Sequence, residues 1–244
     1  MDVMALTDMI SLQENLSAFG YVLLKGWEPE LTTEETAGAL GISIDIATRL
    51  PKSGIPNVQT LTPKSTDLAP KNQYSGTFGL GEFPFHSDLA HWSVPPRYFM
   101  LRCIQGSPTV ATQLLHIDKI TEAIDVSLLR KAVLLPRARM PNAHYCLLPL
   151  SFQRGEVAGI RWDPLFLRPY NDAAVAVGLA LDNQRWGELL RSVVLEEPGD
   201  TLIVDNWRIL HGRSAIDAKS TERKLERIYL DEIKGYDDEC YGRE

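Results

Sequence analysis

The chain has 244 residues, of which 44% are hydrophobic and 23% charged, and its formal net charge is -7 at pH 7. These are ordinary values for a globular protein, and mainly-β proteins of this length commonly form one domain, so we expect a single domain over residues 1–244. The negative charge argues against broad binding to the phosphate backbone of nucleic acids. No apolar run approaches the roughly 18 residues needed to cross a membrane, and a small-molecule partner is therefore expected.

The N-terminal sequence MDVMALTDMISLQENLSAFG lacks a basic leader followed by a long apolar block. We therefore expect no secretory signal and a cytoplasmic location. The three cysteines, Cys103, Cys146 and Cys240, are an odd number at wide spacing. This pattern suits neither a disulfide framework nor a thiolate zinc site, so we interpret them as reduced thiols. Nothing in the sequence indicates an oligomeric state.

The first part of the chain predicts a helix, a strand and a second helix. Apolar residues at helical spacing predict the first helix over residues 4–19, ending at Gly20, and the run YVLLKGW predicts a buried strand. Thr32 lies three residues before Glu35, which is the spacing of a capping box, so the second helix is expected to begin there. Residues 51–70 are rich in Pro, Ser, Thr and Asn and predict a long loop.

The rest of the chain is dominated by short β-type runs. PRYFMLRCIQ and VATQLLHI predict two strands joined as a hairpin by GSPT, and a Pro-Gly-Asp turn precedes the strand TLIVDN. Helical patterns occur at residues 118–133 and, most strongly, at residues 172–194. Short strands with few helices and no alternating βαβ order predict a mainly β protein with flanking helices, and a jelly roll is the leading architecture.

The stretch GEFPFHSDLAHW contains a candidate metal-ligand pair. Side chains two apart on a strand point to the same face, so His86 and Asp88 would aim an imidazole and a carboxylate at one point. Two ligands do not hold a divalent metal tightly, so a third donor must come from elsewhere. His211 is the best placed of the remaining histidines, because it follows a turn and a strand and because Gly212 permits close backbone approach. His91, His116 and His144 are not assigned as ligands.

Two histidines and one carboxylate on a metal leave positions open, an arrangement associated with non-haem Fe(II) oxygenases. A 2-oxo acid cosubstrate that binds such a metal needs a cation at the far end of its pocket. The segment TERKLERIYLD offers Arg223 and Arg227, and the planar fork of arginine matches a carboxylate bidentately.

These residues resemble the TauD/TfdA family, the taurine dioxygenase-like Fe(II)/2-oxoglutarate-dependent oxygenases, which also include γ-butyrobetaine hydroxylase. The resemblance is carried by FPFHSDLAHWSVPPRYFMLRC, by ATQLL, and by PGDTLIVDNWRILHGRSAI together with RKLERIYLD. It implies a distorted double-stranded β-helix, the jelly roll, with catalytic iron ligands at His86, Asp88 and His211. It also implies that Thr112 and Arg223 hold 2-oxoglutarate, with Arg227 as the second choice for the arginine.

The resemblance further implies a reaction in which Fe(II), 2-oxoglutarate and O2 hydroxylate an unactivated C–H bond of a small molecule, releasing succinate and CO2. The substrate would be amino-acid-like or a secondary metabolite. Asp88 points away from the halogenating branch, in which a small residue replaces the carboxylate. Three alternatives stay open: desaturation or cyclisation, a zinc hydrolase with the same ligands, and a non-catalytic metal- or ligand-binding jelly roll.

Candidate substrate contacts lie in two places. The first is the loop before the first ligand strand, with Asn72, Gln73 and Tyr74; the second is the pair Arg161 and Arg213. Asn206 and Arg208 flank Trp207 and are candidates to brace the strand that carries His211 or to reach the pocket.

Overall fold

The computed structural model describes residues 6–49, 54–137 and 146–234. Its first half contains α1 (Leu6–Phe19), β1 (Tyr21–Leu24), α2 (Thr33–Leu40), β2 (Gly41–Ser43), α3 (Ile46–Arg49), β3 (Gln59–Leu61), α4 (Tyr74–Phe78), β4 (Phe83–His86), β5 (Tyr98–Gln105) and β6 (Ala111–His116). There follow α5 (Ile117–Ala123), α6 (Val126–Lys131), β7 (Val133–Pro136), β8 (Leu148–Pro149), β9 (Ser151–Arg154), β10 (Val157–Ile160), β11 (Leu167–Pro169), α7 (Asp172–Asn183), a 3-10 turn (Gly187–Leu189), β12 (Arg191–Val194), β13 (Thr201–Asp205), β14 (Ile209–Arg213) and β15 (Lys224–Ile233).

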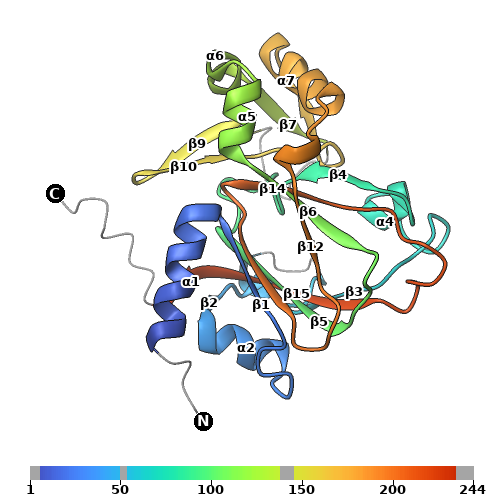
Figure 1. The fold of residues 1–244 in the computed structure, drawn as a ribbon. Coiled ribbons are helices and arrows are strands. Elements are labelled where there is room, and N and C mark those ends of the chain that lie inside the picture. The colour runs from blue at the N-terminus through green and yellow to red at the C-terminus, as the bar shows by residue number, and fades with distance from the viewer. Residues whose placement is uncertain (1–5, 50–53, 138–145, 235–244) are drawn as a thin grey trace.

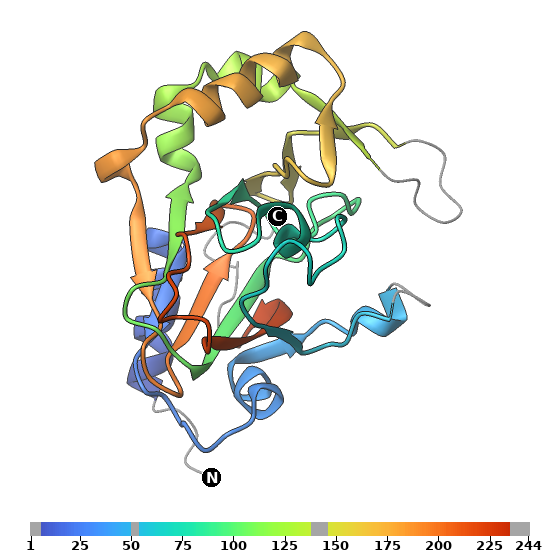
Figure 2. The same cartoon turned by 90° about the vertical axis from the view of Figure 1, so that its right-hand side faces the viewer.

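Two antiparallel sheets form the centre of the molecule (Figures 1 and 2). The larger has the strand order β1-β13-β5-β15-β2, with β3 also paired to β15, and the smaller has the order β12-β6-β14-β4. The two sheets bury a common core, in which Phe99, Leu101 and Leu225 of the larger sheet pack with Leu114 and Ile209 of the smaller. These residues alternate along their strands, as expected for the inward side of a sandwich.

The predicted hairpin between the strands at 96–105 and 110–117 is wrong. β5 pairs with β13 and β15, whereas β6 pairs with β12 and β14, so the GSPT segment crosses from one sheet to the other. The segment is held by residues much later in the chain. The Ser107 amide donates to the Leu195 carbonyl at 3.3 Å, and a Cβ on Gly106 would lie 1.9 Å from the Glu196 oxygen.

The outer face of the larger sheet is covered by α1 and α2, where Leu12, Leu16 and Leu40 pack against Met100 and Leu230. The capping box predicted at Thr32 is present and begins α2. The predicted first helix is confirmed from Leu6 onward, and residues 4 and 5 lie outside the described part of the chain.

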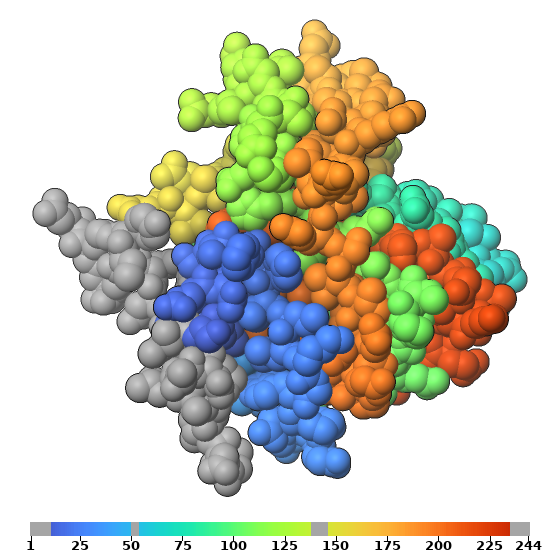
Figure 3. Space-filling model, in the orientation of Figure 1, coloured from blue at the N-terminus to red at the C-terminus, as the bar shows by residue number. Residues whose placement is uncertain are grey.

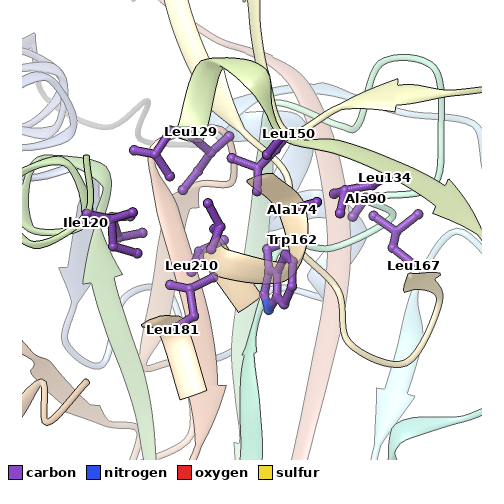
Figure 4. Close-up of a cluster of buried hydrophobic side chains, with 14 of the residues drawn as sticks. Ala90, Ile120, Leu129, Leu134, Leu150, Trp162, Leu167, Ala174, Leu181 and Leu210 are labelled. Atoms are coloured by element: carbon purple, nitrogen blue, oxygen red, sulfur yellow. The ribbon is translucent and has the colours of Figure 1, made fainter. Parts of the chain in front are cut away.

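The outer face of the smaller sheet is covered by the insertion between β6 and β12, which includes α5, α6 and α7 and stands above the sandwich in the space-filling view (Figure 3). Trp162 packs there with Leu210 and Leu181 (Figure 4). The helix predicted over 172–194 is wrong in its second half. α7 ends at Asn183, because residues 191–194 pair with β6 as strand β12.

Cys103 is buried and Cys146 exposed, and both are free thiols, whereas Cys240 lies outside the described residues. Over the parts of the chain that the structure describes, every helix is too short or too polar to cross a membrane.

Candidate metal centre and cosubstrate site

His86, Asp88 and His211 meet on the smaller sheet. β4 and β14 pair antiparallel with His86 opposite His211, and the two imidazole rings have centroids 4.3 Å apart. Asp88 follows β4, and its Oδ1 lies 3.8 Å from Nε2 of each histidine. All three side chains are buried, and one ligand atom from each lies within 4.8 Å of the others. The three residues that the sequence analysis singled out are therefore brought together.

Gly212 allows the two ligand strands to approach. A Cβ at this position would lie 2.6 Å from the Phe83 carbonyl oxygen, which is too close for any other residue without movement of the backbone. The pairing of β14 with β4 also shifts register between His211 and Arg213. The expectation that a glycine beside His211 permits close backbone approach is confirmed.

The two histidines present unprotonated nitrogen atoms to the shared space. His86 Nδ1 lies 2.9 Å from the Pro84 carbonyl oxygen, so a proton on Nδ1 is donated there and the Nε2 lone pair is left for a metal. Burial, reinforced by the neighbouring His86, lowers the pKa of His211 to about 3. His211 is therefore a neutral imidazole at physiological pH, which is the form that binds metals.

Asp88 is held ionised by Arg227. Burial by itself would raise the pKa of the Asp88 carboxyl, but Arg227 and the two histidines outweigh it and lower the pKa below its usual value. Arg227 Nη1 lies 2.8 Å from both oxygens of Asp88, and Nη2 donates to Oε1 of Gln59 at 2.7 Å. The charge of the candidate ligand is thus balanced by an arginine on β15.

The backbone of Asp88 is held by Asn206, which lies directly after β13 and is 1% exposed. The side-chain oxygen of Asn206 accepts from the Asp88 amide at 2.7 Å, and its Nδ2 donates to the carbonyl oxygens of Asp88 at 3.0 Å and Pro96 at 2.9 Å. Leu89, the residue after Asp88, has φ +52°, a conformation that costs a leucine about 1–2 kcal/mol. The three hydrogen bonds of the Asn206 side chain therefore hold the backbone at Asp88 and Leu89 in a turn that the local sequence does not favour.

Thr112 and Arg223 lie on the inward side of the sandwich. Thr112 pairs with Arg213 across β6 and β14, one inward position beyond the Leu114–His211 pair. Arg223 precedes β15 and is 6% exposed, and its side chain has no hydrogen bond or ion pair with any described residue. Burial lowers the pKa of Arg223 to about 10. A buried guanidinium without a counter-ion is costly, which suits it to receive an anionic ligand.

The five predicted substrate contacts differ in their exposure and in the groups that they contact. Asn72 and Gln73 are exposed, whereas the Tyr74 ring stacks on His86 with centroids 4.2 Å apart. Arg161 donates to the carbonyl oxygens of Ala90, Trp92 and Ser93, and Arg213 donates to those of Gly79 and Gly81. Of these five side chains, Tyr74 makes the ring contact with a candidate ligand, while both arginines hold neighbouring loops.

The unassigned histidines have other surroundings. His91 contacts the Phe166 ring at 5.4 Å, and burial lowers its pKa. His116 caps the N-terminus of α5 and contacts Arg208, which also donates to the end of α1. His144 lies outside the described residues.

Three residues near the site were not singled out by the sequence: Asp163, Gln59 and Tyr229. The Tyr229 hydroxyl contributes to the lowered pKa of Asp88, and Gln59 holds Arg227 from the strand β3. Asp163 accepts a hydrogen bond from the Tyr74 hydroxyl at 2.9 Å. An aspartate directly after the strand-like run VAGIRW was a visible signal for Asp163, but Gln59 lies in a segment that predicted only loop.

The donor set fits a divalent transition metal. Two imidazole nitrogens and one ionised carboxylate oxygen lie within 4.8 Å of one another, which is the ligand type and number of the two-histidine, one-carboxylate iron sites. The unpaired guanidinium of Arg223 adds a place for a carboxylate in the same interior.

Comparison with known proteins supports this assignment. The family model described as "Taurine catabolism dioxygenase TauD, TfdA family" matches residues 195–229, which include His211, Arg223 and Arg227. Trimethyllysine dioxygenase from Neurospora crassa is 35% identical over 82 residues, which is 31% of this chain and 17% of that protein. The chain therefore matches less than a fifth of the length of this relative.

Solved structures match over most of the chain. Asparagine oxygenase in complex with Fe(II), hydroxyasparagine and succinate has a TM-score of 0.70 at 18% identity, covering 92% of this chain and 78% of its own. The resemblance to the TauD/TfdA family is confirmed. The oxygenase OrfP in complex with Fe and α-ketoglutaric acid has a TM-score of 0.67 at 20% identity, covering 94% and 81%. At these identities the structures establish the fold, so the predicted TauD-like jelly roll with flanking helices is also confirmed.

Proposed function

We propose that this TauD-like protein is an Fe(II)- and 2-oxoglutarate-dependent oxygenase that hydroxylates an unactivated C–H bond of a small, amino-acid-like molecule. The observation that carries the proposal is the pairing of the His86–Asp88–His211 triad with Arg223, a buried guanidinium that lacks a counter-ion among the described residues. A purely structural metal site does not require such a cation, whereas the distal carboxylate of 2-oxoglutarate matches its planar fork.

Each residue of the site has a separate proposed role. Ferrous iron holding 2-oxoglutarate supplies dioxygen activation, in which the 2-oxo acid is converted to succinate and CO2 while one oxygen atom enters the substrate. His86, Asp88 and His211 would hold the metal, and Arg223 with Thr112 would hold the far carboxylate of the cosubstrate. Arg227 keeps Asp88 ionised, Asn206 fixes its backbone, and the burial of the triad excludes bulk water.

The names of the similar proteins support the proposed substrate class. Their complexes contain hydroxyasparagine in one case and hydroxyarginine in another, and the matched relative is named for trimethyllysine. An amino-acid-like substrate is the corresponding proposal for this chain. A single domain and a cytoplasmic location stay predictions.

The decisive experiment is anaerobic addition of Fe(II) and then 2-oxoglutarate, followed by admission of air. We expect the visible charge-transfer band of the iron–2-oxoglutarate chelate to appear, and succinate to form in air when a substrate is present. Absence of both, with a broad panel of amino acids and their derivatives, would overturn the proposal in favour of a non-catalytic binding protein.

The variant Arg223→Ala tests the cosubstrate site. Truncating one partner of a buried charge pair costs about 2–5 kcal/mol, so the 2-oxoglutarate concentration at half-maximal band should rise roughly 30-fold or more. Fe(II) affinity should be unchanged, because Arg223 makes no contact with the triad residues. Arg185→Ala, at an exposed arginine, is the matched control. If Arg227→Ala gives the 2-oxoglutarate defect instead, the second-ranked arginine holds the cosubstrate.

A further inference from the structure

Asp163 is a buried carboxylate that forms no ion pair with any Lys or Arg among the described residues. It follows β10 and is 2% exposed. All three of its hydrogen bonds reach Oδ1, from the Tyr74 hydroxyl at 2.9 Å and from the amides of Leu165 at 2.8 Å and Phe166 at 2.9 Å. Neither a donor to Oδ2 nor an ion pair with Lys or Arg is present among the described residues. Burial accordingly raises the pKa of Asp163.

This carboxylate lies beside the candidate metal centre. Tyr74, which donates to it, stacks on His86 with ring centroids 4.2 Å apart. The Phe166 ring lies 6.2 Å from the Tyr74 ring and 5.4 Å from that of His91. Asp163 is thus joined through one side chain to a candidate metal ligand.

The turn that Asp163 caps does not explain its charge. An asparagine oxygen could accept the same three hydrogen bonds at Oδ1 without placing a negative charge in the interior. A buried carboxylate costs several kcal/mol unless a cation or further donors compensate it. The missing compensation at Oδ2 therefore points to a group that arrives from outside the chain.

We propose that Asp163 is a substrate-binding residue that receives a positively charged nitrogen bearing N–H donors, such as a primary ammonium or a guanidinium, at its free oxygen Oδ2. The inference rests on the proposed oxygenase function and specifies its substrate class. An N–H donor is required because Oδ2 lacks a hydrogen bond, so a quaternary ammonium would leave it unsatisfied.

The test uses the full chain loaded anaerobically with Fe(II) and 2-oxoglutarate, and reads ligand binding as the perturbation of the charge-transfer band. The probes are two pairs of a cationic and a neutral amino acid: L-arginine with its isostere L-citrulline, and L-lysine with L-norleucine, which lacks the terminal ammonium group. We expect the cationic member of at least one pair to bind about tenfold or more tightly than its neutral partner. Asp163→Asn should abolish that preference while leaving the neutral members and 2-oxoglutarate unaffected. Asp182→Asn, at an exposed aspartate, should change nothing.

The outcomes separate this inference from the function on which it rests. Loss of the band with 2-oxoglutarate in the unmodified protein contradicts the oxygenase itself. If the band is normal, three results would each overturn the role of Asp163. These are equal affinity for both members of each pair, no binding by either cationic probe, and a cation preference that persists in Asp163→Asn. Tighter binding of Nε-trimethyl-lysine than of L-lysine would overturn the N–H requirement. Because asparagine keeps the turn-capping oxygen, the unfolding temperature of Asp163→Asn should stay close to that of the parent.

Discussion

Replacing Asn206 by alanine removes three buried hydrogen bonds at once. The Asp88 amide, the Asp88 carbonyl and the Pro96 carbonyl all lose their partner, at distances of 2.7, 3.0 and 2.9 Å in the parent. A buried polar group left unsatisfied costs about 1–3 kcal/mol, and partial relaxation makes such costs less than additive. We expect Asn206→Ala to lower the free energy of unfolding by about 3–5 kcal/mol.

The same substitution should weaken metal binding. Without the hydrogen bonds of Asn206, Leu89 can leave its left-handed conformation at φ +52°, and the Asp88 carboxylate then loses its fixed direction. We expect the Fe(II) dissociation constant to rise about 10-fold to 100-fold, the range seen when groups that orient metal ligands are removed.

Urea denaturation of the metal-free protein measures the first effect, and anaerobic Fe(II) titration of the folded variant measures the second. Asn183→Ala is the matched control, because this exposed asparagine donates only to a helix carbonyl, that of Leu179. A variant that loses stability but binds Fe(II) as tightly as the parent would show that Asn206 supports the fold without positioning Asp88. A loss below about 1 kcal/mol would refute the hydrogen-bond argument itself.

Two further substitutions test the surroundings of the triad. Arg227→Met leaves Asp88 buried without its cation, so the metal-free variant should be less stable at neutral pH by about 3–5 kcal/mol. In the parent the lowered pKa of Asp88 gives stability that is present above the unfolded-state pKa and lost as pH falls through the folded-state pKa. The deficit of the variant should therefore shrink as the pH falls through the lowered pKa of Asp88, and a deficit equal at all pH values in urea titrations would contradict the pairing. Gly212→Ala should cost about 1–3 kcal/mol and weaken Fe(II) binding, because its Cβ would meet the Phe83 oxygen at 2.6 Å. Gly38→Ala, in α2 with open space around it, should instead stabilise by up to about 1 kcal/mol, and equal thermal shifts for the two would argue against the close strand contact.

The ligand triad could be predicted because its signals are local. His86 and Asp88 share a strand face by their spacing, and His211 is followed by a glycine whose lack of a side chain the strand contact requires. The capping box at Thr32 likewise needs only residues three apart. Where a contact depended on distant segments, prediction failed. The turn after β5 looks like a hairpin, but Gly106 lies against the Glu196 backbone, and no nearby residue indicates that.

Partners distant in the chain show the same limit more sharply. Asn206 was a candidate to brace the strand that carries His211 or to reach the pocket, and its hydrogen bonds reach Asp88, 118 residues earlier in the chain. Asp163 was not singled out by the sequence. Its Oδ1 caps a local turn, but only the fold places Tyr74, 89 residues away, between this carboxylate and His86. The element order of the sandwich fixes such contacts, and the order itself depends on pairings that sequence patterns do not specify.

Charge balance in the interior accounts for which of these residues are available to ligands. Asp88 and Arg227 compensate one another, so this pair can be buried before any ligand arrives. Arg223 is a buried cation and Asp163 a buried anion, and among the described residues neither forms a salt bridge with a side chain of opposite charge. Had the two been close enough to pair, both would be satisfied and neither would select a ligand. Kept apart, they favour an anionic ligand at one place and a cationic one at the other, which is the charge pattern of a dicarboxylic cosubstrate and an amino-acid-like substrate bound together.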